Sequence, residues 1–407
     1  MRKVLLKAPN AFLIIGILLI SLCIFNGAHL QDKITVSAEG ITSENAEEEA
    51  REELEENIKD QIDKLDLNAL QEYVDSLDNY TDGDVGDRLL AYIQGAEFDY
   101  EDFGKELLHI FFAKVAEIIP AFACITAIAL LSGLLSMLKS GMVAQTSSEM
   151  MFLITYAAAL IPLITVLVEC LTTCKESIAA MSKQMQLIFP IMLTLLSASG
   201  STVSASVCRP AVGFFSTTIV GIIENVVFPL TVLIISFSMV GNLTKELKIG
   251  KFTAFFKSIN KWIIGVCISV FGLFFTLQGI TSATYDGVVR RAAKYAIGNG
   301  IPIVGGFLSG GFDIAVAGSV LIKNSLGSMS IFLMLSVLFE PLVLLIAVSL
   351  MLRLVSAITQ PFGESRISNF LGETATNLQY CTAGLLFTAF LYFLSIVMMI
   401  FCTEALF

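Results

Sequence analysis

Long apolar segments recur along this sequence of 407 residues and limit it to one class of fold. Windows of about 20 apolar residues follow one another through the second half, and each is long enough to cross the ~30 Å hydrocarbon core of a bilayer. Charged residues make up only 15% of the chain, whereas an average soluble domain has about 25%. The sequence therefore predicts an all-α membrane protein that crosses the bilayer several times, with about six full spans.

Charge is distributed unevenly along the chain. Residues 39–106 hold 23 acidic and five basic residues, a net charge of −18, so the rest of the chain sums to +7. The first 38 residues combine a basic start with a short apolar core, which is typical of a secretory signal sequence. Cleavage after Ala28 or Ala38 and an uncleaved anchor are open alternatives, and each places the acidic segment, 39–110, outside the cytoplasm. Neither the acidic segment nor the mildly basic body suits nucleic acid as a partner.

The acidic segment contains apolar residues at helical spacing. Two stripes predict two short amphipathic helices; they consist of Leu54, Ile58, Ile62 and Leu65, and of Leu67, Leu70, Val74 and Leu77. A solvated leader without fixed structure is the alternative that this composition leaves open.

Two stretches of the membrane part resemble each other at a fixed offset. Residues 150–242 align with residues 262–354, so that Pro190 corresponds to Pro302 and Pro229 corresponds to Pro341. Each stretch contains a straight span, a short interrupted segment and a long span with proline, which predicts two membrane repeats; chance similarity between apolar helices is the alternative. The remaining divisions are a first span with its loop, a basic connector, and a cytoplasmic loop with the last span (111–149, 243–261 and 355–407).

The interrupted segment of each repeat predicts a re-entrant hairpin. Residues 187–213 and 299–325 are each too short to cross the bilayer twice, and small residues interrupt them. A broken backbone at membrane depth is tolerated inside protein or beside water, and glycine gives the chain freedom to turn. We expect the breaks at five glycines, namely Gly200, Gly305, Gly306, Gly310 and Gly311.

The basic connector predicts the orientation of the spans. Five lysines stand at 242–261 against one acidic residue: Lys245, Lys248, Lys251, Lys257 and Lys261. Lysine-rich loops are retained in the cytoplasm, so the connector should be cytoplasmic. Phe252, Phe255, Phe256 and Ile259 follow helical spacing, which predicts an amphipathic helix on the inner surface of the bilayer.

Charged residues within or beside the apolar segments are the candidate functional residues. Carboxylates are costly inside a membrane and usually face an interior or a cavity. The hypothesis is a polar pathway along the interface of the repeats, and internal ion pairing without transport is the alternative. The candidates are Asp313, Glu224, Glu340, Arg209 and Lys323.

No catalytic, metal or cofactor site is predicted. The two histidines and scattered cysteines form no local set of nitrogen and sulfur ligands. Asp286 and Asp313 could be compared with the paired carboxylates of an intramembrane aspartyl protease, but Asp286 lies in a charged loop and Phe312 replaces the glycine expected before Asp313. The sequence therefore predicts a protein that is not an enzyme.

Three stretches carry a family resemblance: Phe-Leu-Ser-Gly-Gly-Phe-Asp (307–313), Leu-Ile-Lys-Asn-Ser-Leu-Gly (321–327) and Gln-Pro-Phe-Gly-Glu-Ser-Arg-Ile (360–367). With these stretches and its order of segments, the chain resembles the stage III sporulation protein AE family of endospore-forming bacteria. The resemblance extends over about 120–402 and provides no catalytic residues to transfer.

The resemblance implies a place and a set of partners. It implies a multi-pass protein of the mother-cell membrane around the forespore, within the channel apparatus that joins the two cells. The expected partners are the lipid bilayer, other proteins of the same sporulation operon, and a forespore membrane protein across the intermembrane space. The function expected is that of a permease-like component that forms or gates a small-molecule pathway; the alternative is a scaffold that assembles the channel proteins and transports nothing.

Overall fold

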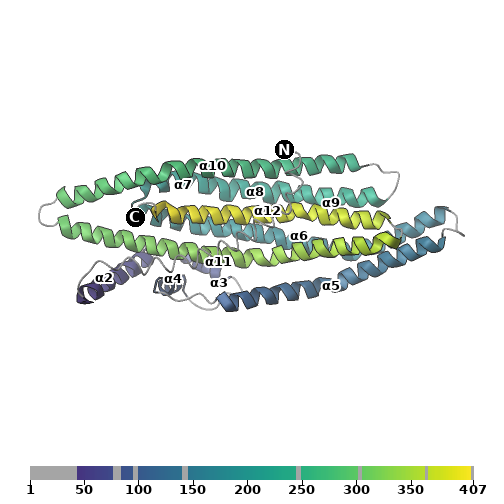
Figure 1. Ribbon diagram of the computed structural model, residues 1–407, viewed down its shortest axis with the longest axis horizontal. Coiled ribbons are helices and arrows are strands. Elements are labelled where there is room, and N and C mark those ends of the chain that lie inside the picture. Colours follow the sequence, from purple (N-terminus) through teal and green to yellow (C-terminus); the bar gives the residue numbers. More distant parts are fainter. Residues whose placement is uncertain are drawn as a thin grey trace.

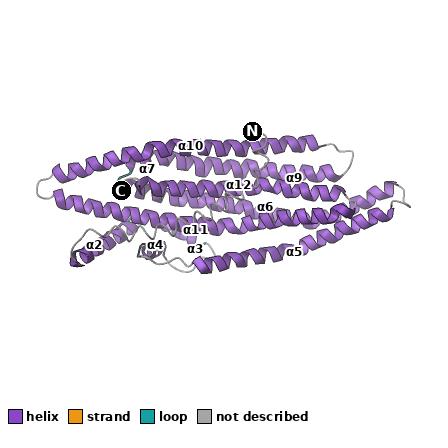
Figure 2. Cartoon of the chain, in the orientation of Figure 1, coloured by secondary structure: helices purple, strands orange, loops and turns teal. Residues whose placement is uncertain are grey.

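The computed structural model describes residues 44–76, 84–94, 100–139, 145–243, 249–300, 305–362 and 365–404, and these contain helices and no strands (Figure 2). Three short helices come first: α2 (Glu44–Asp63), α3 (Asn68–Asp75) and α4 (Val85–Ile93). The long helices are α5 (Tyr100–Lys139), α6 (Gln145–Ala198), α10 (Gly250–Gly300), α11 (Gly305–Thr359) and α12 (Ser365–Glu404), with a short turn, η4 (Gln360–Phe362), before α12. The predicted all-α fold is confirmed for these residues, and the predicted signal sequence lies outside them.

A further helical stretch connects α6 to α10. It contains α7 (Thr202–Gly213), η2 (Phe214–Ile219), α8 (Val220–Ile222), η3 (Ile223–Val227) and α9 (Phe228–Leu243). The segments η2 and η3 are π-helical, a geometry in which each turn holds an additional residue. Together these segments, which we call α7–α9, run as one helix of 42 residues.

The long helices run antiparallel along a single elongated bundle (Figure 1). Ser182 of α6 donates a hydrogen bond to the carbonyl of Ser216, and Tyr156 of α6 donates one to the carbonyl of Met239. These two bonds join residues at increasing distance from the turn at 199–201, so α6 and α7–α9 pair along their whole length. We call the end of the bundle at this turn the tip end. The opposite end, where α6 and α12 begin and α9 ends, is the connector end.

Six helical stretches in the described residues are long and apolar enough to cross a membrane: 108–134, 149–198, 202–243, 250–274, 313–359 and 366–401. The expected number of about six spans is therefore confirmed by length and composition. Several are much longer than a bilayer requires, because the 54 residues of α6 extend for about 81 Å at 1.5 Å per residue.

The first predicted hairpin is present as a turn, and its re-entrant character is not confirmed. Gly200 adopts a positive φ of 86°, between Ser199 and Ser201, in the left-handed region where glycine carries no steric cost. The arms on both sides are not short half-helices, however. On one side, residues 172–186 are helical, so the arm continues into the span predicted at 151–171. On the other side, the arm continues into α8 and α9, and the stretch 202–243 is one helix. The corrected description is one long helical hairpin with Gly200 at its tip.

The second predicted break is wrong at two of its four glycines. Helix α11 begins at Gly305 and runs without interruption through Gly310 and Gly311. The proposed repeat is not confirmed, since its offset would place a turn equivalent to 199–201 inside this helix. Glycine permits a turn but does not impose one, and a long apolar helix keeps its backbone hydrogen bonds satisfied by continuing. The predicted connector is not a separate helix in its described part, because α10 begins at Gly250 and continues through residue 261 without a break.

The described helices α2, α3 and α4 of the acidic segment pack on the tip half of the bundle (Figure 1). Ile58 and Ile62 of α2, and Leu70 and Val74 of α3, are buried, which confirms the two predicted stripes; Leu77 lies outside the described residues. Helices α2 and α4 contact α11, and α3 contacts α6. Helix α12 lies at the centre, where it contacts α6, α9, α10 and α11.

Candidate functional site

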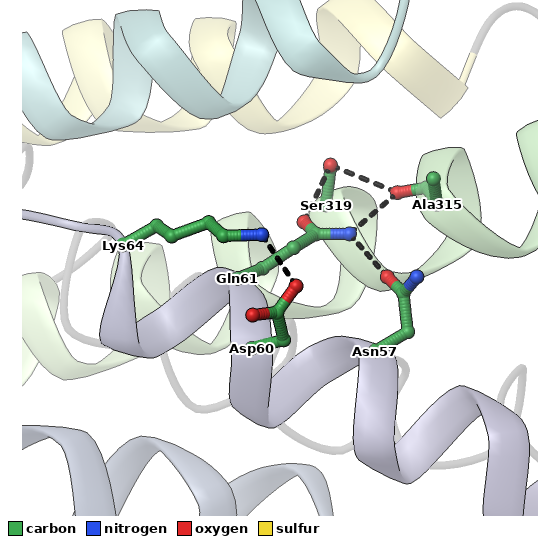
Figure 3. A network of polar contacts seen from close by, with 6 residues as sticks. All are labelled: Asn57, Asp60, Gln61, Lys64, Ala315 and Ser319. Carbon is green, nitrogen blue, oxygen red and sulfur yellow. Dashed lines mark hydrogen bonds and ion pairs between the residues drawn. The ribbon is translucent and has the colours of Figure 1, made fainter.

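A polar network attaches α2 to α11 (Figure 3). The Gln61 side chain donates to the carbonyl of Ala315 at 3.0 Å and accepts from the hydroxyl of Ser319 at 2.8 Å. Gly318 of α11 lies next to the Gln61 side chain, and a Cβ atom at Gly318 would stand 3.1 Å from Nε2 of Gln61. The absence of a side chain at Gly318 therefore lets α2 approach the α11 backbone closely. The opposite face of α2 is exposed and mainly acidic.

A second contact fixes α3 to the core of the bundle. The buried Gln184 of α6 donates to the hydroxyl of Tyr73 at 3.1 Å and to the carbonyl of Leu333 at 3.1 Å. Burial raises the pKa of the Tyr73 hydroxyl, although the bond from Gln184 acts in the opposite direction. The hydroxyl stays neutral, so this contact joins α3, α6 and α11 through uncharged groups.

Two of the predicted pathway residues form ion pairs between neighbouring helices. Glu340 of α11 lies 3.0 Å from the ammonium of Lys114 in α5, which also lies 3.2 Å from Glu117. Glu224 of η3 lies 3.9 Å from Lys175 of α6. Sequence analysis identified the two carboxylates and missed both lysines. One interhelical ion pair thus joins α5 to α11, and the other joins α6 to η3.

The other three predicted residues lie elsewhere. Lys323 is fully buried, and its ammonium donates to the carbonyls of Met399 and Ile400 near the end of α12. Arg209 is exposed on α7, which packs on α6 and α10, whereas Asp313 is partly buried near the start of α11, which packs on α2. The structure does not gather the five charged residues along one path.

A strip of uncharged polar residues lies buried between α9, α10 and α12. Asn260 of α10 donates to the Thr231 hydroxyl at 3.0 Å, and Asn377 of α12 donates to the Ser238 hydroxyl at 3.3 Å. The side-chain oxygens of both asparagines are buried without a hydrogen-bond partner. Sequence analysis missed this strip. The only signal for it in the sequence was the presence of amides in apolar helices. This signal has physical weight, because a buried amide oxygen without a hydrogen-bond partner costs about 1–3 kcal/mol.

One arginine joins three helix ends at the connector end. Arg366 of α12 donates to the carboxylate of Glu149 in α6 at 3.1 Å and to the carbonyl of Leu243, the last residue of α9, at 3.5 Å. Its guanidinium also stands 3.5 Å from the centre of the Phe152 ring, a cation–π contact. This planar group therefore orients α6, α9 and α12 relative to one another.

Comparison with known proteins identifies the family. Residues 85–403 match the family described as stage III sporulation protein AE, which is more than three quarters of the chain. The chain belongs to the stage III sporulation protein AE family. The resemblance inferred from the sequence is thereby confirmed.

A curated relative belongs to the same family. The stage III sporulation protein AE of Bacillus subtilis (strain 168) is 25% identical over 313 residues, which cover 77% of this chain and 78% of the relative. No solved structure matches the chain. The family match begins at Val85, so α2 and α3 lie outside it, whereas the stretches containing Lys323 and Arg366 lie inside it.

Proposed function

We propose that this sporulation protein is a membrane-embedded scaffold of the apparatus that serves endospore development. In this proposal it resides in the mother-cell membrane around the forespore. It presents α2–α4 to its partners, which are other proteins of the same operon and a forespore membrane protein across the intermembrane space. The observation that carries the proposal is the attachment of α2 and α3 to the bundle through Gln61 and Gln184.

The attachment matters because it fixes the position of a charged surface. Helix α2 buries its apolar stripe against the bundle and leaves acidic side chains in solvent, among them Glu52, Glu53, Glu56 and Asp63. A surface held in one orientation loses little entropy when a partner binds, so it favours assembly. Two charged residues of the long helices support the same function, since Glu224 and Glu340 join neighbouring helices through their lysine partners.

The scaffold function predicts that the acidic face of α2 captures partner proteins. The variant with Glu52→Gln, Glu53→Gln, Glu56→Gln and Asp63→Asn should accumulate in membranes normally, because these side chains are exposed. Four lost exposed pairs at about 0.2–1 kcal/mol each, or about 0.8–4 kcal/mol in total, should weaken partner binding by about fourfold to several hundredfold. Co-purification of the operon's other proteins at low and high salt measures the effect, because salt screens such contacts.

The matched control keeps the charge at the same positions. The variant with Glu52→Asp, Glu53→Asp, Glu56→Asp and Asp63→Glu should retain co-purification and spore yield. If the neutral variant co-purifies partners and makes spores as well as the unmodified protein, the acidic face of α2 has no docking role and the proposal fails.

A second function is a conduit for small uncharged polar solutes. The buried strip with Asn260 and Asn377 favours it, because two amide oxygens without partners are suited to accept hydrogen bonds from a passing solute or water. Polar groups of this kind also bind helices together, which is the competing explanation. The conduit would run between α9, α10 and α12.

The conduit predicts that the double variant Asn260→Leu and Asn377→Leu stops forespore development while protein level and co-purification stay normal. Leucine has the same branched shape as asparagine, so the substitution removes the hydrogen-bonding groups while it keeps the outline of the side chain, although the methyl groups occupy more volume than the amide. Asn225→Leu, at an exposed position of η3, is the matched control. Normal spore yield from the double variant would exclude a conduit through this strip.

A further inference from the structure

The exposed surface of α6 changes character halfway along the helix. Between 149 and 171 its exposed side chains are apolar except for Thr165, and they include Met150, Ile154, Ile161, Ile164 and Val168. Between 172 and 198 every exposed residue is polar, alanine or proline (Thr172, Lys175, Glu176, Ala179, Lys183, Gln186, Pro190, Thr194 and Ala198). The core side of the helix is mainly apolar in both halves, so the two halves differ chiefly on their exposed side.

The neighbouring helices show the same band of apolar surface. On α7–α9 exposed polar residues dominate up to Asn225, and from Val226 to Val240 the exposed side chains are mainly apolar. On α10 the exposed apolar side chains run from Phe252 to Leu273, with Lys261 exposed among them. Helix α5, whose outer face is apolar along most of its length, begins only halfway along α11 (Figure 1). Among the described side chains, the exposed apolar surface is therefore concentrated in the connector half of the bundle, and Val207, Phe214 and Phe401 are exposed apolar exceptions in the tip half.

Ion pairs mark both borders of the band. The contact between Gln184 and Leu333 fixes the register of α6 against the antiparallel α11. Lys175 precedes Gln184 by nine residues and Glu340 follows Leu333 by seven, so these two side chains lie at nearly the same level along the bundle. The ion pairs Lys175–Glu224 and Lys114–Glu340 therefore form one row. Glu149 with Arg366 marks the other border.

The distances match a bilayer. From Met150 to Val168 the apolar surface extends for about 27 Å, close to the ~30 Å of the hydrocarbon core. From Glu149 to Lys175 the two ionic borders are about 39 Å apart, close to the ~40–45 Å that includes the headgroups. Ammonium, guanidinium and carboxylate groups at these levels would meet headgroups and water.

We propose that the lipid bilayer covers only the connector half of the bundle, between these two rows of ion pairs, and that the tip half projects into water. Lys251 at the start of α10 and Arg366 near the start of α12 lie at the connector end, and the lysine-rich connector predicts that this end faces the cytoplasm, which orients the projection away from it. From Lys175 to Ala198 the projection extends about 35 Å beyond the outer border. It carries α2–α4, the buried Lys323 and the contact between Gln184 and Tyr73.

Cysteine labelling in intact membranes tests this placement. Single cysteines at Lys183→Cys and Thr194→Cys probe the tip half, and Ile154→Cys and Ile161→Cys probe the band; all four side chains are exposed, so folding should be preserved. The background is Cys124→Ser, because Cys124 is the free thiol that is exposed among the described residues. The protein is produced in vegetative cells, in whose plasma membrane the non-cytoplasmic face meets the medium. The probe is a membrane-impermeant maleimide, added to protoplasts and, separately, to inside-out vesicles.

We expect the cysteines at 183 and 194 to react from outside in protoplasts, and those at 154 and 161 to react from neither side until detergent is added. A cysteine at 183 or 194 that reacts only in detergent would overturn the proposal, because that surface would then be covered by lipid or by another protein. Reaction at 154 or 161 in intact membranes would overturn it as well. Neither result depends on whether the protein acts as a scaffold or a conduit.

Discussion

Gly327→Leu should prevent stable folding of the bundle. Gly327 lies where α11 meets α12, the most extensive helix contact in the described structure. A Cβ atom added there would stand 2.6 Å from Cδ1 and 3.0 Å from Cγ1 of Ile400, and 3.4 Å from Cγ2 of Ile396. A leucine would force the two helices apart, at an expected cost of about 3 kcal/mol or more in the free energy of unfolding. The measurement is protein level in membranes and the midpoint of thermal unfolding in detergent.

Two control variants separate this effect from the general effect of replacing a glycine. Gly265→Leu changes a glycine of α10 at which an added Cβ atom meets no other atom within 4 Å, so it should be tolerated. Gly327→Ala should cost much less than Gly327→Leu, because the closest atom is the mobile end of a side chain and alanine favours a helix by about 1 kcal/mol over glycine. A Gly327→Leu protein as stable as Gly265→Leu would show that the helices separate freely at this point.

Lys323→Ala should lower stability by about 3 kcal/mol, within the range for removing a large, fully buried side chain. The substitution leaves a cavity between α11 and α12 and takes the ammonium donor away from the carbonyls of Met399 and Ile400. Lys323→Met, in contrast, fills the same volume and no longer requires a charge to leave water. Replacing a buried charge by a matching apolar group is often neutral or stabilising, so Lys323→Met should be at least as stable as the unmodified protein.

The comparison of these two variants shows what the buried ammonium contributes. Thermal unfolding and spore yield are measured for both. If Lys323→Met is as unstable as Lys323→Ala, the ammonium and its hydrogen bonds, and not the volume of the side chain, hold the end of α12. A stable Lys323→Met protein that fails to support spores would show that the charge serves function.

Several features of the fold could be predicted because they depend on local sequence. The helical class and the number of spans follow from apolar segments of sufficient length, since backbone groups in lipid must bond within the helix. The stripe with Ile58 and Ile62 follows from a helical period, and burial confirms it. Gly200 could be identified as a turn because serines surround it and no long apolar run passes through it.

The candidate site could not be predicted in the same way. Glu340 was identified as a costly charge, but its partner Lys114 lies 226 residues earlier and only the packing of α5 on α11 brings them together. The asparagines of the buried strip are separated by more than 100 residues and resemble ordinary surface polar residues when α10 and α12 are considered alone.

The sequence by itself thus determined which segments are helical, which side of each short helix is apolar, and to which family the chain belongs. The tertiary structure decided that the helices extend far beyond the thickness of a bilayer, that Gly310 and Gly311 lie within a helix, and which charges meet. The physical reason is that backbone hydrogen bonding and side-chain periodicity act over a few residues, whereas ion pairs and close helix contacts join residues far apart in the chain. Glycine and charge mark where such contacts are possible, and only the packing of the neighbouring helix determines which ones form.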